Sequence, residues 1–105
     1  MAYIGKVLIS SEWAKLEDLI KAQVSGQSSF AFDSDKDYSI QIETSQPGTS
    51  FGAYACNSAS TPAGDDDGEH LSEEQFVEYK PESGSYLYIK TRGGSTDVKV
   101  AVSEK

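Results

Sequence analysis

The sequence predicts a mainly β protein: an antiparallel β-sandwich or small barrel with one N-terminal amphipathic α-helix. Apolar residues follow a helical period in one segment near the start of the chain, and in no later segment. After Gly26, apolar and polar residues alternate in several short segments, which turn-forming residues separate. Because a parallel sheet needs crossover connections, which are usually helical, the lack of a second helical segment favours antiparallel strands.

The N-terminal part, residues 1–26, is expected to form an arm followed by the helix. The apolar run 3–9 is typical of a strand or an extended arm. Ser10 or Ser11 is suited to cap a helix that ends before Gly26. An apolar stripe at spacings of three and four residues is formed by Trp13, Leu16, Ile20 and Val24, with Leu19 beside it. We expect this stripe to pack on the domain's own sheet; the alternative is docking on a neighbouring subunit.

The remaining residues, 27–105, are expected to form the β-rich body of the same single domain, 1–105. Strands are predicted at 29–32, 38–42, 51–56, 74–79, 86–90 and 98–102. Turns are predicted at 33–37, 46–49, 82–85 and 92–95, and a long loop at 57–68. A chain of 105 residues has a modest core, so contacts with other copies would add useful burial.

The composition is that of a globular protein and argues against nucleic acid and membranes as partners. Hydrophobic residues make up 37% of the chain, and the net charge is -8. An acidic surface repels phosphate backbones and anionic lipids. No apolar run reaches membrane-spanning length, and the N-terminal residues lack the pattern of a secretory signal. We therefore expect synthesis and folding in a cytoplasm.

Cys56 and His70 are each the only residue of their kind, and neither indicates catalysis. A single cysteine excludes an intrachain disulfide and a thiolate zinc cage, and the apolar run around Cys56 predicts a buried small hydrophobe. His70 follows an acidic run in a segment that we interpret as an exposed loop, so no nucleophile and base are paired. No catalytic residue and no cofactor are expected.

Two acidic clusters are tested as metal sites and rejected. Asp33, Asp35 and Asp37 imitate the start of a calcium loop. The positions that need glycine and glutamate hold Tyr38 and Thr44 instead. The second cluster, 65–67, is interpreted as a polar turn, and no role is assigned to the loop that ends at residue 68. No metal is expected.

The six tyrosines leave two interpretations open. Tyrosines of small β domains are often half-buried strand residues, and that is the expectation here. The alternative is a surface that recognises a sugar or a protein, because tyrosine combines an apolar ring with a polar tip. An exposed aromatic platform would favour recognition, whereas convergent carboxylates in a cleft would favour a small hydrolase.

Three stretches give the chain a resemblance to a known group of proteins. They are a helix with one tryptophan at 11–20, a strand at 38–42 followed by 54–59 and a Pro/Asp/Gly loop, and 79–90 with a closing valine strand. In these patterns the chain resembles small β-rich structural proteins of tailed bacteriophages. Such proteins are often trimeric, and they cement or decorate capsids or attach to tails.

The resemblance implies a non-enzymatic virion protein that binds and stabilises the capsid surface, made in the bacterial host cytoplasm. Its partners would be its own copies, in a homotrimer, and the major capsid protein or another virion protein. A short apolar run at a terminus has little domain of its own to cover it. The candidate contact residues are therefore Tyr3, Ile4, Val7, Leu8, Ile9 and Trp13. The alternative function is a receptor- or glycan-binding module on a tail or fibre.

Overall fold

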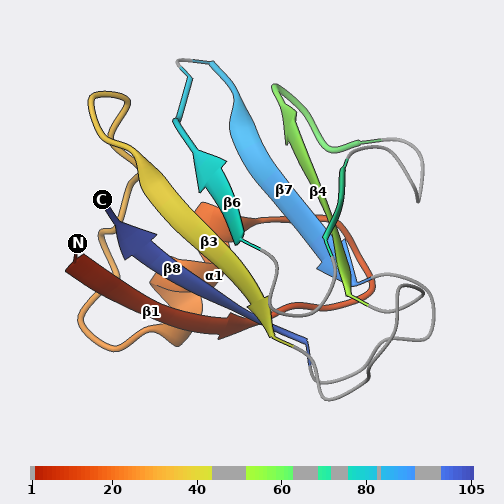
Figure 1. The fold of residues 1–105 in the computed structure, drawn as a ribbon, viewed down its shortest axis with the longest axis horizontal. Helices are drawn as coiled ribbons and strands as arrows, with labels where there is room; N and C mark the ends of the chain where they lie inside the picture. The colour runs from red at the N-terminus through yellow and green to blue at the C-terminus, as the bar shows by residue number, and fades with distance from the viewer. Residues whose placement is uncertain (1, 44–51, 63–68, 72–75, 83, 92–97) are drawn as a thin grey trace.

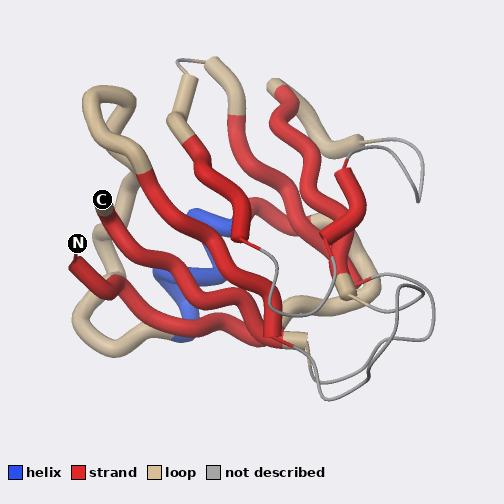
Figure 2. Tube along the Cα trace, viewed as in Figure 1, coloured by secondary structure: helices blue, strands red, loops and turns tan. Residues whose placement is uncertain are grey.

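The chain is mainly β, with antiparallel sheets and one helix among the residues that the structure describes (Figure 1; Figure 2). The computed structural model describes residues 2–43, 52–62, 69–71, 76–82, 84–91 and 98–105. The expected turns at 46–49 and 92–95 and the acidic cluster 65–67 lie outside these ranges. No helix in these ranges is long and apolar enough to cross a membrane.

The first sheet joins the two ends of the chain. Its strand order is β1 (Ala2–Leu8), β8 (Lys99–Glu104), β3 (Tyr38–Glu43) and β6 (Phe76–Tyr79). All three pairings are antiparallel. The N- and C-terminal strands therefore lie side by side, as Figure 1 shows.

The second sheet is also antiparallel throughout. Its strand order is β2 (Ala14–Lys15), β7 (Tyr86–Thr91), β4 (Ala53–Ser58) and β5 (Glu69–Leu71). The sequence did not predict β5, because it is very short and follows a segment rich in loop-forming residues. His70 therefore belongs to a strand, and the expectation of a loop at this position is wrong.

The helix α1 (Leu16–Gln23) lies behind the first sheet in Figure 1 and contacts β1, β2 and β7. It begins later than the sequence predicts. Residues 14 and 15 pair with β7 instead, and the backbone N–H of Thr91 donates to the carbonyl oxygen of Ser10 at 2.8 Å. Lys15 is therefore the N-cap residue, without a side-chain capping hydrogen bond, and the Oγ of Ser10 accepts the N–H of Glu12 ahead of β2.

One apolar core lies between α1 and the inner faces of the sheets. Leu16 and Ile20 of the predicted stripe are fully buried in it. In β3 buried and half-buried residues alternate, which confirms the predicted period of two. Val98, Val100 and Val102 of the last predicted strand are also fully buried.

The segment that precedes β3 is not the predicted strand. Residues 29–32 form no ladder, because the N–H of Phe30 donates to the carbonyl of Gln27 and the N–H of Phe32 donates to the carboxylate of Glu17. Phe32 instead makes edge-to-face contacts with Phe30, Tyr38 and Tyr79, with ring centroids 4.8–5.2 Å apart. This aromatic cluster closes one end of the core.

Candidate functional site

The outer face and edge of β1 form the first candidate site. Among the described strands, β1 pairs with β8 alone, so it is an edge strand. Tyr3 lies opposite Ser103 and Leu8 opposite Lys99, on the outer face of the sheet. Tyr3 is 63% exposed and Leu8 is 48% exposed. A shift in the register between Tyr3 and Gly5 keeps both side chains on this face.

Beside these two side chains, the outer face of the first sheet carries small and charged side chains. Ala101 and Ser103 of β8 occupy its centre, and both are small. Across them the Nζ atom of Lys6 on β1 approaches the Oε2 atom of Glu43 on β3, at 2.8 Å. The hydrogen bond and negative charge of Glu43 raise the pKa of Lys6. The face therefore carries a charged strip, with its exposed apolar side chains at the rim.

The end of β1 is tied to the end of α1 by a side chain that sequence reasoning missed. The N–H of Leu8 donates to Oε1 of Gln23 at 2.8 Å, and Nε2 of Gln23 donates to the carbonyl of Leu8 at 2.9 Å. The side-chain amide of Gln23 thus makes the two hydrogen bonds with Leu8 that a neighbouring strand residue would make. Gly5 allows the close packing nearby, because a Cβ atom there would lie 2.8 Å from the methyl groups of Val24.

The structure separates the six predicted contact residues into three groups. Tyr3 and Leu8 are exposed on β1, and Ile4 and Trp13 are half-buried. Val7 and Ile9 are 1% and 5% exposed and belong to the chain's own core.

The expectation that little of the domain covers this run is therefore wrong for Val7 and Ile9. Their strand pairs with β8 and packs against α1, so the remainder of the domain encloses its inner face. They are removed from the proposed contact.

Trp13 lies before the helix rather than inside it, in the bend that leads to β2. The Nζ atom of Lys90, a largely buried residue of β7, lies 5.8 Å from the centre of its ring. This distance is within the range of cation–π attraction. Trp13 therefore contacts the outer part of the second sheet and remains half-buried.

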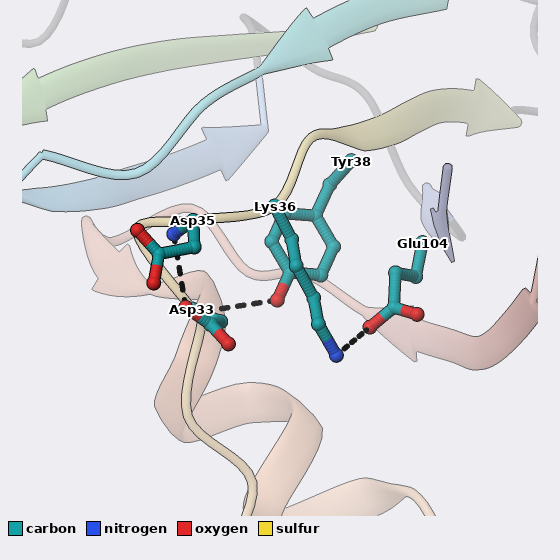
Figure 3. Close-up of polar contacts among 5 residues, drawn as sticks. All are labelled: Asp33, Asp35, Lys36, Tyr38 and Glu104. Atoms are coloured by element: carbon teal, nitrogen blue, oxygen red, sulfur yellow. Dashed lines mark hydrogen bonds and ion pairs between the residues drawn. The ribbon is translucent and has the colours of Figure 1, made fainter.

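The Asp33–Asp37 segment is a turn, as predicted. In Figure 3, Oδ1 of Asp33 accepts the N–H of Asp35, and the N–H of Asp33 donates to the hydroxyl of Tyr38, each at 2.9 Å. Lys36 forms an ion pair with Glu104 at 2.9 Å, and that carboxylate raises the pKa of Lys36. The groups of this turn therefore serve to fix the start of β3 beside the end of β8.

Cys56 lies half-buried in β4, as a free thiol. No group of three or more potential metal-binding side chains occurs in the part of the chain that the structure describes. Tyr38, Tyr79 and Tyr88 are buried, whereas Tyr3 and Tyr86 are exposed. The tyrosines thus divide between the two interpretations, and no single platform gathers the exposed ones.

A half-open cavity of about 230 Å³ is the second candidate site. It lies where the start of α1, the segment before β3 and the connection from β6 to β7 meet. Its lining includes Glu17, Phe32, Tyr79, Glu82, Tyr86 and Leu87. Because these residues come from distant parts of the sequence, no local sequence motif indicates the cavity. The nearest sequence signal is the predicted turn at 82–85, which begins with Glu82 and is followed by Tyr86.

The electrostatics of the cavity are set by two carboxylates beside a phenol. Burial, together with the negative charges of Glu17 and Glu82, raises the pKa of Tyr79 to about 12. Within the described residues, neither glutamate forms an ion pair. The cavity is therefore an acidic recess with an aromatic wall.

No family model matches this chain, and no curated protein or solved structure is significantly similar to it.

Proposed function

We propose that this chain is a non-enzymatic virion structural protein that binds and stabilises a capsid surface through the outer edge of β1. The observation that carries the proposal is the exposure of Tyr3 and Leu8 on an edge strand. Among the described residues, Tyr86 is the only other large hydrophobic side chain that is exposed. Exposed apolar residues at a sheet edge are suited to burial against another protein.

The small size of the domain makes burial of these side chains in an assembly energetically useful. Full burial of one large apolar side chain contributes about 1.5–3 kcal/mol, and half of that is available where a side chain is already half-covered. Two such side chains repeated in every copy of a symmetric assembly add up to a useful contact. We propose a homotrimer, seated on the major capsid protein or another virion protein, as the assembly that buries them.

The proposal includes an open β-sandwich as the finer architecture. It is supported by the core, because buried side chains from both sheets, such as Ile40 of β3 and Ile89 of β7, belong to one cluster. The outer face of the first sheet, with its ion pair between Lys6 and Glu43, would then meet the shell.

The test replaces the exposed apolar side chains without touching the core. Tyr3→Ser combined with Leu8→Ser should weaken self-association, measured by light scattering, and cosedimentation with shells of the phage that encodes the protein. We expect a loss of about tenfold or more in each apparent affinity. Ala22→Ser combined with Ala31→Ser is the control, because it makes two exposed apolar positions polar outside both β1 and the cavity.

The proposal predicts that the control variant still binds as the unmodified chain does. A monomeric protein that never cosediments with shells would refute it. Equal weakening by the control would show that the contact is not located at β1.

A second function, a receptor- or glycan-binding module on a tail or fibre, is favoured by one observation. The cavity places Tyr86, which is 39% exposed, beside Tyr79 and two carboxylates. Aromatic faces and carboxylates are common in sugar sites, because a ring packs on the apolar face of a sugar. A glycan that protects Tyr86 from exchange or modification, in a chain that binds no shell, would select this function.

A further inference from the structure

The cavity is built by three separate parts of the fold. Glu17 comes from the first turn of α1, and Phe32 from the aromatic cluster before β3. Tyr79 ends β6, and Glu82 and Tyr86 flank the start of β7. The volume of about 230 Å³ lies below the 300 Å³ or so at which pockets for drug-sized ligands begin. The space therefore suits one side chain or one small molecule.

The walls of the cavity are positioned by the fold and do not depend on a ligand. The N–H of Phe32 donates to Oε1 of Glu17 at 3.3 Å, which ties the aromatic segment to the helix. The ring of Phe32 meets that of Tyr79 edge-on, with centroids 5.2 Å apart. The N–H of Ser85 donates to the carbonyl of Glu82 at 3.2 Å and closes the turn that carries this carboxylate.

Both charged side chains in the described lining of the cavity are carboxylates, and the ammonium group of Lys15 lies at its rim. Its described lining contains Glu17 and Glu82 and no lysine, arginine or histidine. Both carboxylates lie close enough to Tyr79 to act on its phenol. In a half-enclosed recess two such charges attract a cation more strongly than they would on an open surface.

The rim of the cavity already binds one ammonium group of the chain itself. The Nζ atom of Lys15 lies 3.8 Å from the centre of the Tyr86 ring, a close cation–π contact. Lys15 belongs to β2 and is not part of the cavity lining. The contact places a positive charge against this aromatic wall, and it occupies one face of the ring that a sugar would need.

From the size, the charge and the aromatic wall together, we propose that the cavity binds an alkylammonium or guanidinium group, presented as a lysine or arginine side chain of a partner protein. Glu17 and Glu82 would neutralise the cation, and the rings of Tyr79 and Tyr86 would pack along its stem. The site goes beyond the proposed function, because none of its residues lies on β1. It adds a second, charge-selective contact to the domain.

The test uses the full chain and four small probes. N-acetyl-arginine amide and N-acetyl-lysine amide carry the proposed group, putrescine carries it without a peptide, and N-acetyl-glutamine amide is the neutral control. Binding is followed by NMR shifts of the Tyr79, Glu82 and Tyr86 signals. We expect saturable binding of the cationic probes, weaker at high salt.

Two double variants with the same net charge locate the site. Glu17→Gln combined with Glu82→Gln keeps the acceptor oxygen for Phe32 and should weaken binding about tenfold or more. Glu12→Gln combined with Glu43→Gln removes two charges elsewhere and should leave the affinity unchanged. Near-ultraviolet circular dichroism verifies that both variants fold.

Each remaining outcome either supports or refutes the proposed cation site. Tighter binding of the two amides than of putrescine supports a protein partner, and the reverse supports a free amine with the same chemistry. Equal binding of the glutamine amide, or an equal loss in both double variants, refutes a cation site. Binding of a monosaccharide or hydrolysis of a nitrophenyl glycoside, with no binding of the cations, also refutes it. Failure of shell binding by the Tyr3 and Leu8 variant leaves this result untouched, so the two proposals fail separately.

Discussion

Leu8 and Ile9 are sequence neighbours that the fold separates completely. Leu8 is 48% exposed on the outer face of the first sheet. Ile9 is 5% exposed, belongs to the core, and donates its N–H to the carbonyl of Val98 at 3.1 Å. Replacement of either residue by alanine removes the same number of carbon atoms. The two substitutions therefore test whether the N-terminal segment packs in the core of the domain or is an arm that becomes buried only when a partner binds.

The expected costs differ severalfold. Ile9→Ala leaves a void in the core and should lower the free energy of unfolding by about 2–5 kcal/mol. Leu8→Ala should lower it by about 1 kcal/mol or less, because half of the side chain already contacts water. With a urea dependence of about 1–3 kcal/mol per molar, the midpoints should separate by about 0.3 M or more.

Urea unfolding of the isolated protein, followed by circular dichroism at two protein concentrations, measures both effects. The Leu8→Ala cost should grow with concentration if copies associate through β1, whereas the Ile9→Ala cost is present at every concentration. Equal costs for the two variants, or an Ile9→Ala cost below about 0.5 kcal/mol, would refute the assignment of this segment to the core.

Three further predictions follow from particular contacts. Gln23→Ala removes both hydrogen bonds to the backbone of Leu8 and should cost about 1–2 kcal/mol. Gln23→Glu places a carboxylate oxygen against the carbonyl oxygen of Leu8 at the C-terminus of α1 and should cost at least as much; urea unfolding measures both. Trp13→Ala should cost about 1–3 kcal/mol, less than a core tryptophan, because the ring is half-buried; its native emission should shift further to the red on unfolding. The folded chain holds the pKa of Tyr79 at about 12, against about 10 when unfolded. The resulting contribution to the free energy of unfolding is therefore complete below pH 10 and is lost as the pH rises towards 12. The loss of unfolding free energy between pH 10 and pH 12 should be about 1–3 kcal/mol smaller in Tyr79→Phe. An unchanged dependence of the unfolding free energy on alkaline pH in that variant would contradict the pKa shift.

The strands that the sequence predicted well are those whose pattern is imposed by one buried face. In β3 and β8, β-branched residues alternate with polar ones, and any partner that covers one face selects the same register. The mainly β class and the one helix among the described residues follow from such local periods. The antiparallel order of the strands agrees with the absence of crossover helices in the part of the chain that the structure describes.

The errors arise where a distant segment competes with a local preference. Ser10 and Ser11 carry a good helix-start signal, yet residues 14 and 15 pair with β7, which a local pattern cannot reveal. Phe30 and Phe32 alternate like strand residues, but their rings pack into an aromatic cluster while their N–H groups bond elsewhere. In each case tertiary contacts outweigh a preference worth about 1 kcal/mol.

Only one of the two candidate sites could be predicted from the sequence. The β1 site is a continuous run of sequence, and its apolar character is visible in Tyr3 and Leu8. The cavity is assembled from Glu17, Phe32 and the residues around the β6–β7 connection, which only the folded chain brings together. Neither glutamate differs, in sequence, from the other acidic residues of an acidic protein.

The sheet order places the two sites at opposite edges of the first sheet. β1 and β6 are separated by β8 and β3, a span of about 14 Å at the usual strand spacing. A copy that is held through the outer edge of β1 would therefore keep the cavity beside β6 accessible. Tyr3 and Leu8 offer apolar contact without selectivity for charge, whereas Glu17 and Glu82 select a cation and offer little apolar area. An apolar edge that supplies affinity and an acidic recess that fixes orientation on a basic residue would together let one small domain bind a shell in one register, which neither site would achieve alone.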